Sequence, residues 1–312
     1  MSSEDAGHIE PWLQDWCKRE LGAAPVEQLL AASLMSDVKA VRLGDGREIV
    51  IKTRPDPTGR VATCLAVQRA AAAAGLPCAR PLTEVSSVGD LAVHAEQWRP
   101  GGEIARGTDV AAAELSARLY AAVIAVTSRL GSPPPLPNPE WVRWDHDGLG
   151  HWPPNDLHDH RPGADSLRPD LVAVAARTRK RLLAAASMPH VLGHADWEAQ
   201  NLRWTGSTPY VVHDWDSVAW LPESALVGAA SGAFASVETP TLAPLESSEV
   251  FLEAYQEERG FALTRDELEV AWAASLWPAL HNGRAEILWT HPHVALTALL
   301  EQADARLERA AA

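Results

Sequence analysis

The spacing of hydrophobic residues in the first part of the chain predicts a mixture of helices and strands. Apolar residues three and four apart at 11–21 predict a helix, which a glycine then ends. Hydrophobic and polar residues alternate at 36–52 on either side of the sequence GDG, and this pattern predicts a β-hairpin. An alanine-rich run at 60–77 predicts a second helix, and residues 89–98 predict a strand that enters a Pro-Gly connection. Residues 1–98 are thus expected to form an α+β unit.

The remaining residues, 99–312, are expected to be mostly helical. Two long helices are predicted at 109–130 and 166–186, and a segment rich in Pro, His and Asp separates them. The densest polar chemistry lies at 191–220, where a turn separates two short apolar runs with the character of strands. Further helices complete the C-terminal part, at residues 247–260, 264–283 and 293–312.

Length and charge favour two lobes and a small-molecule partner. A chain of 312 residues with 46% hydrophobic content is longer than one hydrophobic core usually organises. Its formal net charge of −14 argues against a surface for nucleic acid or anionic membranes, because phosphate groups are bound by clustered Lys and Arg. A neutral or cationic small molecule suits this charge better. Composition leaves the oligomeric state open.

Cysteine usage and the N-terminal segment favour a reducing compartment. Cys17, Cys64 and Cys78 are odd in number, widely spaced and without a CxxC pair, which indicates neither a disulfide framework nor a zinc knuckle. The start of the chain lacks the basic and apolar segments of a signal peptide, and charged residues interrupt the most alanine-rich stretches. We therefore expect a cytoplasmic protein without a membrane span.

Residues 193–204, GHADWEAQNLRW, carry the pattern of a phosphoryl-transfer loop. His194, Asp196 and Asn201 fit the spacing H-x-D-x-x-x-x-N, in which Asp accepts the proton of the attacking hydroxyl and Asn binds Mg²⁺. This spacing arises by chance in about one chain in a hundred of this length, so it is only moderately specific alone. His194 is expected to hold the loop by a hydrogen bond rather than to transfer protons.

Two further residues lie in the order that a kinase-like site requires. Asp214 ends a short apolar run thirteen residues after Asn201, where a second Mg²⁺ ligand would follow a strand-turn-strand step. Lys52 ends the second strand of the predicted hairpin, a position suited to binding nucleotide phosphates. Asp216 is either a third metal contact or a helix cap, and the cap is favoured. Two lobes around a cleft would bring these residues together with Asp196.

The sequences HADWEAQN and VVHDWD, together with Lys52, resemble the aminoglycoside phosphotransferase family, small-molecule kinases related in fold to protein kinases and choline kinases. The resemblance implies an α+β, bilobal protein-kinase-like fold with a small β-rich N-lobe at 1–98 and a mostly helical C-lobe at 99–312. It implies transfer of the γ-phosphoryl group of ATP (or GTP), with Mg²⁺, to a hydroxyl of an aminoglycoside, aminosugar or similar polar metabolite. The implied roles are catalytic base for Asp196, Mg²⁺ ligands for Asn201 and Asp214, phosphate ligand for Lys52, and adenine contacts from the hinge backbone at Glu96, Gln97 and Trp98.

Two departures from the family's usual pattern leave an alternative open. Family members usually carry a Glu on the first-lobe helix that pairs with the strand lysine, whereas residues 60–77 contain no acid and Cys64 stands near that position. A carboxylate from elsewhere, such as Glu84, could substitute. The loop at 31–38 also lacks glycine, which makes a close approach of backbone to phosphates less assured. The alternative function is a nucleotide-binding pseudokinase with a regulatory or scaffolding role.

Candidate acceptor-binding residues come from the catalytic loop and from a helix near the C-terminus. Glu198 either faces the acceptor and attracts an amine or is a solvated loop carboxylate. Trp197, Trp272 and Trp277 could stack on a sugar or a cation, with core packing as the favoured alternative for each. The helix that carries Trp272 offers further candidates in His281, Asn282, Arg284 and Glu286.

The segment at 133–165 contains four His and several Asp residues, which raises the possibility of a zinc site in a metal-dependent hydrolase. Structural zinc sites use tight Cys/His spacings, which this segment lacks. A loop close to the acceptor site is therefore the favoured interpretation.

Overall fold

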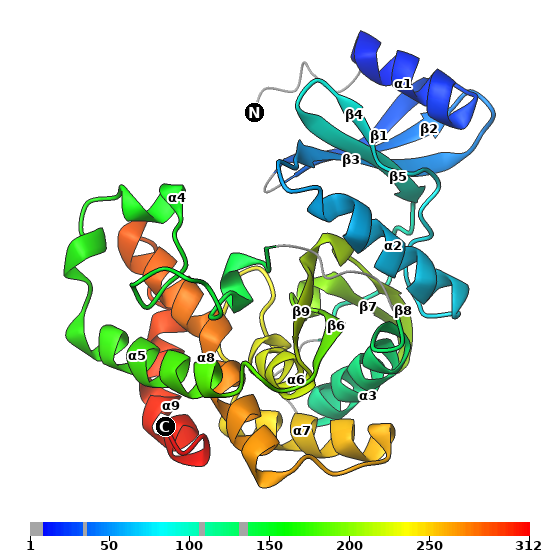
Figure 1. Ribbon diagram of the computed structural model, residues 1–312. Coiled ribbons are helices and arrows are strands. Elements are labelled where there is room, and N and C mark those ends of the chain that lie inside the picture. The colour runs from blue at the N-terminus through cyan, green and yellow to red at the C-terminus, as the bar shows by residue number, and fades with distance from the viewer. Residues whose placement is uncertain (1–8, 34–35, 106–109, 131–136) are drawn as a thin grey trace. The chain divides into compact units, whose positions relative to one another are not determined.

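The computed structural model divides into two compact units, Met1–Gly101 and Gly102–Ala312 (Figure 1). The first unit is rich in β-structure and the second is mostly helical, so the predicted fold class is confirmed. Each unit is described by itself below. The structure describes residues 9–33, 36–105, 110–130 and 137–312.

The first unit contains an antiparallel sheet made of β1 (Pro25–Ser33), β2 (Asp37–Leu43), β3 (Glu48–Pro55), β4 (Ser86–Val88) and β5 (Leu91–Gln97). The strand order is β1-β2-β3-β5-β4. The predicted hairpin is present as β2 and β3, and Gly46 in its turn adopts a φ of 88° that glycine tolerates best. Strands β1 and β4 were not predicted, because β1 is largely exposed with two register shifts and β4 has only three residues.

The two faces of this sheet differ in character. Ile51 of β3 belongs to a buried hydrophobic cluster that includes residues of α1 (Pro11–Leu21). Lys52 is the next residue, and it points to the opposite face because strand side chains alternate. Glu96 of β5 shares that face, where it contacts a side chain of α2 (Arg60–Ala73). Hydrophobic packing thus holds one face, and polar side chains gather on the other.

The second unit consists mainly of α3 (Val110–Thr127), α4 (Asp156–Asp159), α5 (Pro169–Ala184), α6 (Glu223–Ala233), α7 (Leu245–Arg259), α8 (Arg265–Leu288) and α9 (Ala295–Arg309). Its strands are β6 (His190–His194), β7 (Leu202–Thr205), β8 (Thr208–Val212) and β9 (Val218–Pro222), paired as β6 with β9 and β7 with β8. Short 3₁₀ turns are η1 (Glu140–Val142), η2 (Ala164–Ser166), η3 (Ala199–Asn201) and η4 (Trp215–Ser217). The long helices and the hairpin predicted here are present, although residues 133–136 of the His-rich segment lie outside the described residues.

Helix α6 packs against α8 at very short range, and the sequence did not predict it. Gly228 and Gly232 face α8, where an added Cβ would collide with the backbone oxygens of Ala271 and Ser275. All residues of α6 from Ser224 to Ala233 are buried. A helix buried on every side has no polar face, so the periodic signal that reveals amphipathic helices is absent.

Helix α3 is long and apolar enough to cross a membrane by length and composition alone. It packs against α7 and β6, and 56% of its most apolar window is buried within the protein. The core position of α3 accounts for its hydropathy.

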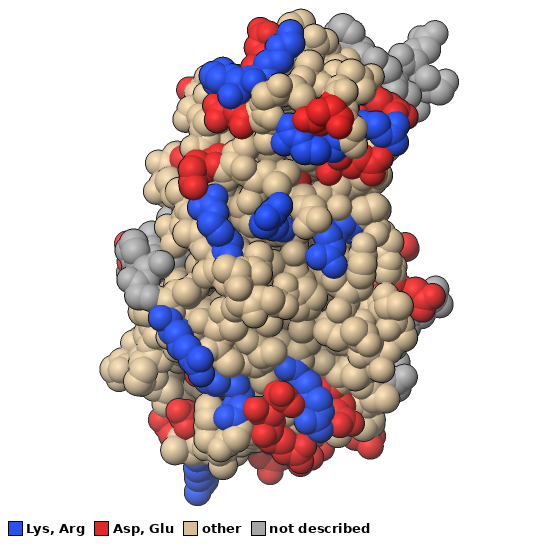
Figure 2. Space-filling view, turned by 90° about the vertical axis from the view of Figure 1, so that its right-hand side faces the viewer, with Lys and Arg blue, Asp and Glu red and all other residues tan. Residues whose placement is uncertain are grey.

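Basic and acidic side chains are interspersed on the face of the molecule shown in Figure 2. Ion pairs join α3 to α7, where Arg118 lies 2.8 Å from Glu114 of its own helix and 3.3 Å from Glu257. Such exposed pairs contribute only about 0–1 kcal/mol each to stability. Hydrophobic packing therefore stabilises the contact between the two helices more than these charges do.

Candidate active site

The candidate catalytic loop begins where β6 ends at His194. The buried imidazole of His194 accepts a hydrogen bond at Nδ1 from the backbone N–H of Asp196 (3.3 Å), so Nε2 carries the proton and donates to the backbone oxygen of His213 (2.9 Å). The Tyr120 hydroxyl donates to the backbone oxygen of His194 at 2.9 Å. His194 therefore ties the loop to the segment before Asp214, which is the loop-holding role expected from the sequence.

Asn201 fixes the carboxylate of Asp196. Its Nδ2 donates to the backbone oxygen (3.0 Å) and to Oδ2 (2.8 Å) of Asp196, so its own Oδ1 is directed away from that carboxylate. Burial raises the pKa of Asp196 to about 6, the hydrogen bond from Asn201 opposes this shift, and the charge of Asp216 adds to it. A carboxylate with a raised pKa is a stronger base that remains largely ionised at neutral pH.

The hairpin of β7 and β8 places Asn201 beside Asp214. The N–H of His213, just after β8, donates to the backbone oxygen of Asn201, just before β7, at 2.8 Å. Asp214 adopts a left-handed conformation with φ of 60°, which is uncommon for residues other than glycine but more frequent for Asp. Its Oδ2 accepts a hydrogen bond from the Ser217 hydroxyl at 3.1 Å. The two predicted metal ligands thus lie at the same end of one hairpin.

The chemistry of these two groups fits Mg²⁺. Asn201 offers an amide oxygen and Asp214 a carboxylate, and Mg²⁺ prefers such hard oxygen ligands. Because Mg²⁺ usually keeps several waters and is held by one or two protein groups plus substrate phosphates, two protein ligands are sufficient. Within the described ranges, no three His, Cys, Asp or Glu side chains gather as a metal site, and this includes the His-rich segment considered for zinc.

Asp216 does not have the capping role that the sequence favoured. Asp214 occupies the N-cap position of η4, and Asp216 lies inside that turn. The charge of Asp216 instead acts on Asp196, whose pKa it raises. The helix-cap prediction is therefore wrong, and the alternative of a third metal contact stays a prediction.

Glu198 is buried rather than solvated. Its side chain accepts a hydrogen bond from Nε2 of Gln200 at 2.6 Å, and only 8% of the residue is exposed. Burial and the nearby charge of Asp196 raise the pKa of Glu198 to about 8, against the opposing hydrogen bond from Gln200. The alternative of a solvated loop carboxylate is wrong, and a second carboxyl group lies buried in the catalytic loop.

In the first unit, Lys52 has a carboxylate partner that the sequence did not reveal. Its Nζ lies 3.2 Å from Oε1 of Glu96, and the two side chains are only 13% and 5% exposed. Gln68 of α2 donates from Nε2 to Oε2 of Glu96 at 2.7 Å. Glu84, the substitute considered from the sequence, lies 2.8 Å from Arg69 instead, so that suggestion is wrong. A glutamine on the otherwise apolar buried face of α2 is the signal that could have identified this arrangement.

The expected hinge residues occupy the end of β5 and the position after it. Gln97 is the last residue of β5, its N–H donates to the backbone oxygen of Arg80 at 2.9 Å, and Trp98 follows. Glu96 directs its side chain at Lys52, a role different from the backbone contact expected. Contact of this backbone with adenine stays a prediction.

Three of the candidate acceptor residues have structural roles. Trp197 is fully buried, and its Nε1 donates to the Ser116 hydroxyl at 3.0 Å. Trp272 is 8% exposed and lies 5.6 Å from the guanidinium of Arg306. Glu286 accepts hydrogen bonds of 2.8–3.0 Å from three backbone N–H groups at the start of α9. Core packing, which was the alternative for both tryptophans, and helix capping account for these side chains.

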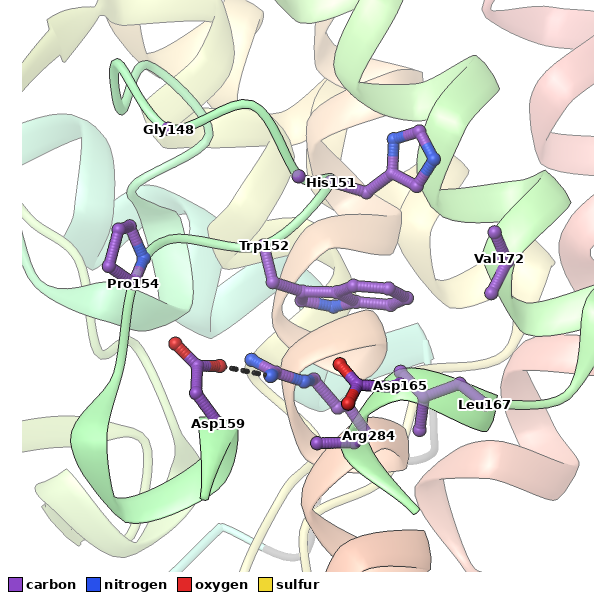
Figure 3. A pocket seen from close by; sticks show the side chains of 11 residues that line it. Gly148, His151, Trp152, Pro154, Asp159, Asp165, Leu167, Val172 and Arg284 are labelled. Atoms are coloured by element: carbon purple, nitrogen blue, oxygen red, sulfur yellow. Dashed lines mark hydrogen bonds and ion pairs between the residues drawn. The ribbon is translucent and has the colours of Figure 1, made fainter. Parts of the chain in front are cut away.

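A cavity of about 380 Å³ lies between the segment 148–167 and the helices α5 and α8 (Figure 3). The indole of Trp152 lies flat above the guanidinium of Arg284 in this view, and Asp165 lies on the other side of the guanidinium from Asp159. Arg284, whose side chain is 7% exposed, forms an ion pair of 2.5 Å with Asp159. The segment that was expected near the acceptor therefore lines a cavity with an aromatic ring and charged groups.

His281 lies on α8, the helix that also carries Arg284. Its ring lies 5.6 Å from that of His158. Burial, the proximity of His158 and the positive charge of Arg284 together lower the pKa of His281 to about 3, and burial contributes most. His281 is therefore neutral at physiological pH.

A sequence model described as the phosphotransferase enzyme family matches residues 27–222, which is more than half of the chain. The chain belongs to this family. The site geometry fits this membership, because the match includes Lys52, Asp196, Asn201 and Asp214. No curated protein matches the sequence of this phosphotransferase.

Solved structures resemble this phosphotransferase over nearly its whole length. The amicoumacin kinase hAmiN, in complex with AMP-PNP, Ca²⁺ and Ami, has a TM-score of 0.63 at 11% identity, with 97% of this chain and 90% of that chain covered. A candidate fructosamine-3-kinase from Thermobifida fusca has a TM-score of 0.56 at 19% identity, with 95% and 98% covered. Spectinomycin phosphotransferase with ADP and spectinomycin has a TM-score of 0.56 at 12% identity, with 97% and 98% covered. The likeness is one of fold, and the kinase-like fold expected from the sequence is confirmed.

Proposed function

We propose that this phosphotransferase transfers the γ-phosphoryl group of ATP (or GTP) to a hydroxyl of a small polar metabolite that carries an amine, such as an aminoglycoside or an aminosugar. The observation that carries the proposal is the hydrogen-bonded pair of Asp196 and Asn201, adjacent to Asp214 at the end of one hairpin. Orienting an acceptor hydroxyl and holding phosphate-bound metal ions require these groups.

Asp196 is the group that would receive the acceptor hydroxyl. Its Oδ2 is held by Asn201, so Oδ1 is the atom available to accept the hydroxyl hydrogen bond and to align the attacking oxygen. His194 fixes the loop backbone, and the carboxylate therefore needs little rearrangement before the reaction. When bound by Asn201 and Asp214, Mg²⁺ would offset the negative charge of the phosphates. Lys52 would add a positive charge at the phosphates.

The cavity beside Trp152 is the proposed site for the part of the acceptor remote from the reacting hydroxyl. An indole face packs well against the apolar face of a sugar ring or against a cation. Asp159 and Asp165 can accept hydrogen bonds from an ammonium group. The Nε1 of Trp152 and the Nε of Arg284 are buried and have no hydrogen-bond partner among the described residues. A hydroxylated, amine-bearing ring would suit the indole face and the two carboxylates.

The solved structures support the two classes of ligand in this proposal. The amicoumacin kinase contains AMP-PNP and Ca²⁺, and the spectinomycin phosphotransferase contains ADP with spectinomycin. We propose that this chain likewise binds a nucleotide with a divalent cation, here Mg²⁺, and a small-molecule acceptor. We also propose a cytoplasmic location, where ATP and Mg²⁺ are available.

The test is nucleotide consumption with a panel of aminoglycosides, aminosugars, choline and macrolides. Wild type is compared with Asp196→Asn and with the control Asp147→Asn, which makes the same change at an exposed position. We expect turnover with at least one amine-bearing sugar and a loss of about 10²–10⁴-fold in kcat for Asp196→Asn. Turnover that survives in Asp196→Asn would refute the role of this residue. Tight nucleotide binding without turnover of any acceptor would favour the pseudokinase alternative.

A further inference from the structure

A chain of three side chains links the two strands and the helix around Lys52. Lys52 on β3 contacts Glu96 on β5, and Gln68 on α2 contacts the other oxygen of Glu96. The second hydrogen bond of Gln68, to the backbone oxygen of Ala79 at 2.8 Å, fixes the orientation of its amide. All three side chains are at least 87% buried. This arrangement defines which way the ammonium group of Lys52 can point.

We propose that Glu96 is the positioning residue for Lys52, and that Gln68 holds Glu96 in place for this task. In this chain, the aim of the phosphate-binding lysine thus depends on a carboxylate from β5, and α2 contributes only a neutral amide. The proposal rests on the function proposed above, because it concerns how Lys52 meets the nucleotide phosphates.

The energetics of burial explain why the pair persists. An isolated buried charge is costly, whereas a buried pair with further hydrogen bonds can be maintained. Burial alone would raise the pKa of Glu96, but the charge of Lys52, the hydrogen bond from Gln68 and the charge of His94 together lower it. Glu96 therefore remains ionised beside Lys52.

Glu84, the carboxylate considered from the sequence, does not compete for this role. Glu84 pairs with Arg69 and is 81% exposed. Cys64 lies one helical turn before Gln68 on the same buried face and carries no carboxylate. The ladder register makes Glu96 the suitable group, since it lies opposite Val50, two residues from Lys52 on the same face of the sheet.

Without Glu96, Lys52 would lose the carboxylate that directs its ammonium group. A lysine ammonium is a mobile point charge on a four-carbon stem, and ordering that stem costs conformational entropy. Glu96→Gln should therefore weaken binding of Mg²⁺–AMP-PNP about tenfold and leave the KM of the acceptor unchanged, since neither Glu96 nor Lys52 lines the cavity proposed for the acceptor. Gln68→Met, which removes only the supporting amide, should weaken nucleotide binding about two- to fourfold.

The experiment is a double-mutant cycle on the full chain, read by titration calorimetry with Mg²⁺–AMP-PNP. Lys52→Met should weaken binding at least as much as Glu96→Gln, and the double variant should bind no more weakly than Lys52→Met, because Glu96 acts through Lys52. Glu84→Gln is the matched control: it makes the same change at a carboxylate paired with α2, and it should bind like wild type. Thermal unfolding of each variant shows whether it is folded, and Gln68→Met, which removes no charge, replaces Glu96→Gln if the latter does not fold.

The outcomes separate this inference from the proposed function. Wild-type binding that Glu96→Gln and Gln68→Met leave intact would overturn the inference and spare the function. Losses that multiply in the double variant would also overturn it, because Glu96 would then act independently of Lys52. Wild type that does not bind Mg²⁺–AMP-PNP would refute the proposed function, and the inference would fall with it.

Discussion

Replacing Glu286 should destabilise the protein without affecting acceptor recognition. Its carboxylate accepts hydrogen bonds from the N–H groups of Val294, Ala295 and Leu296, at 3.0, 2.8 and 2.9 Å. Losing an N-terminal helix cap costs about 1 kcal/mol, and each buried N–H left without a partner adds about 1 kcal/mol or more. Since Ala295 and Leu296 are almost fully buried while Val294 can turn to water, Glu286→Ala should cost about 3 kcal/mol.

Differential scanning calorimetry and steady-state kinetics test this prediction together. A loss of about 3 kcal/mol corresponds to a Tm decrease of about 6–12 °C for a unit of this size. Glu286→Gln keeps one acceptor oxygen and should lose about half as much, and the exposed Glu301→Ala on α9 should leave Tm unchanged. An unchanged Tm with a raised acceptor KM in Glu286→Ala would refute the capping role and restore the substrate contact considered from the sequence.

Two further predictions concern packing and pH. Gly232→Ala should lower the free energy of unfolding by about 1–3 kcal/mol or more, because the new methyl group would collide with the backbone oxygen of Ser275. Gly150→Ala is the control and should be tolerated, because its Cβ would meet only an oxygen at 3.8 Å. Equal denaturant midpoints for the two variants would contradict this prediction. The pKa of His281 is lowered to about 3 in the folded protein, whereas in the unfolded chain it is near 6.5. Between these two pKa values the unfolded chain binds a proton at His281 that the folded chain does not. The free energy of unfolding therefore falls as the pH decreases from about 6.5 towards 3. From pH 7 to pH 5, the free energy of unfolding of the wild type should fall by about 1–2 kcal/mol more than that of His281→Gln. His293→Gln, a change at an exposed histidine, is the control and should behave like the wild type. Parallel pH profiles of stability for the wild type and His281→Gln would contradict the prediction.

Elements with local signals were predictable from the sequence. The hairpin of β2 and β3 has both alternation and a glycine turn, and α8 begins with a capping box formed by Thr264 and Glu267. Helix α6 has no such signal, because its interface with α8 is buried all round and depends on glycines that allow close approach. The sequence analysis therefore missed α6, whose position depends on tertiary packing alone.

The same distinction applies to the candidate site. Asp196 and Asn201 are five residues apart in one loop, and Asp214 follows the hairpin that starts at Asn201, so their proximity is encoded locally. Trp152 and Arg284 are more than a hundred residues apart, and only the packing of the His-rich segment on α8 brings them to one cavity. No spacing rule could have paired them.

The pairing of Lys52 combines both situations. A lysine that is only 13% exposed needs a nearby carboxylate, and this physical requirement could be stated from burial alone. Where that carboxylate lies depends on strand register, because a shift of one residue in the β3–β5 ladder would turn Glu96 to the hydrophobic face. The helix α2 has no acidic residue at the expected position, where Cys64 stands. The negative charge that Lys52 needs comes instead from Glu96 on the neighbouring strand β5. In this chain the supporting charge therefore comes from β5 rather than from α2.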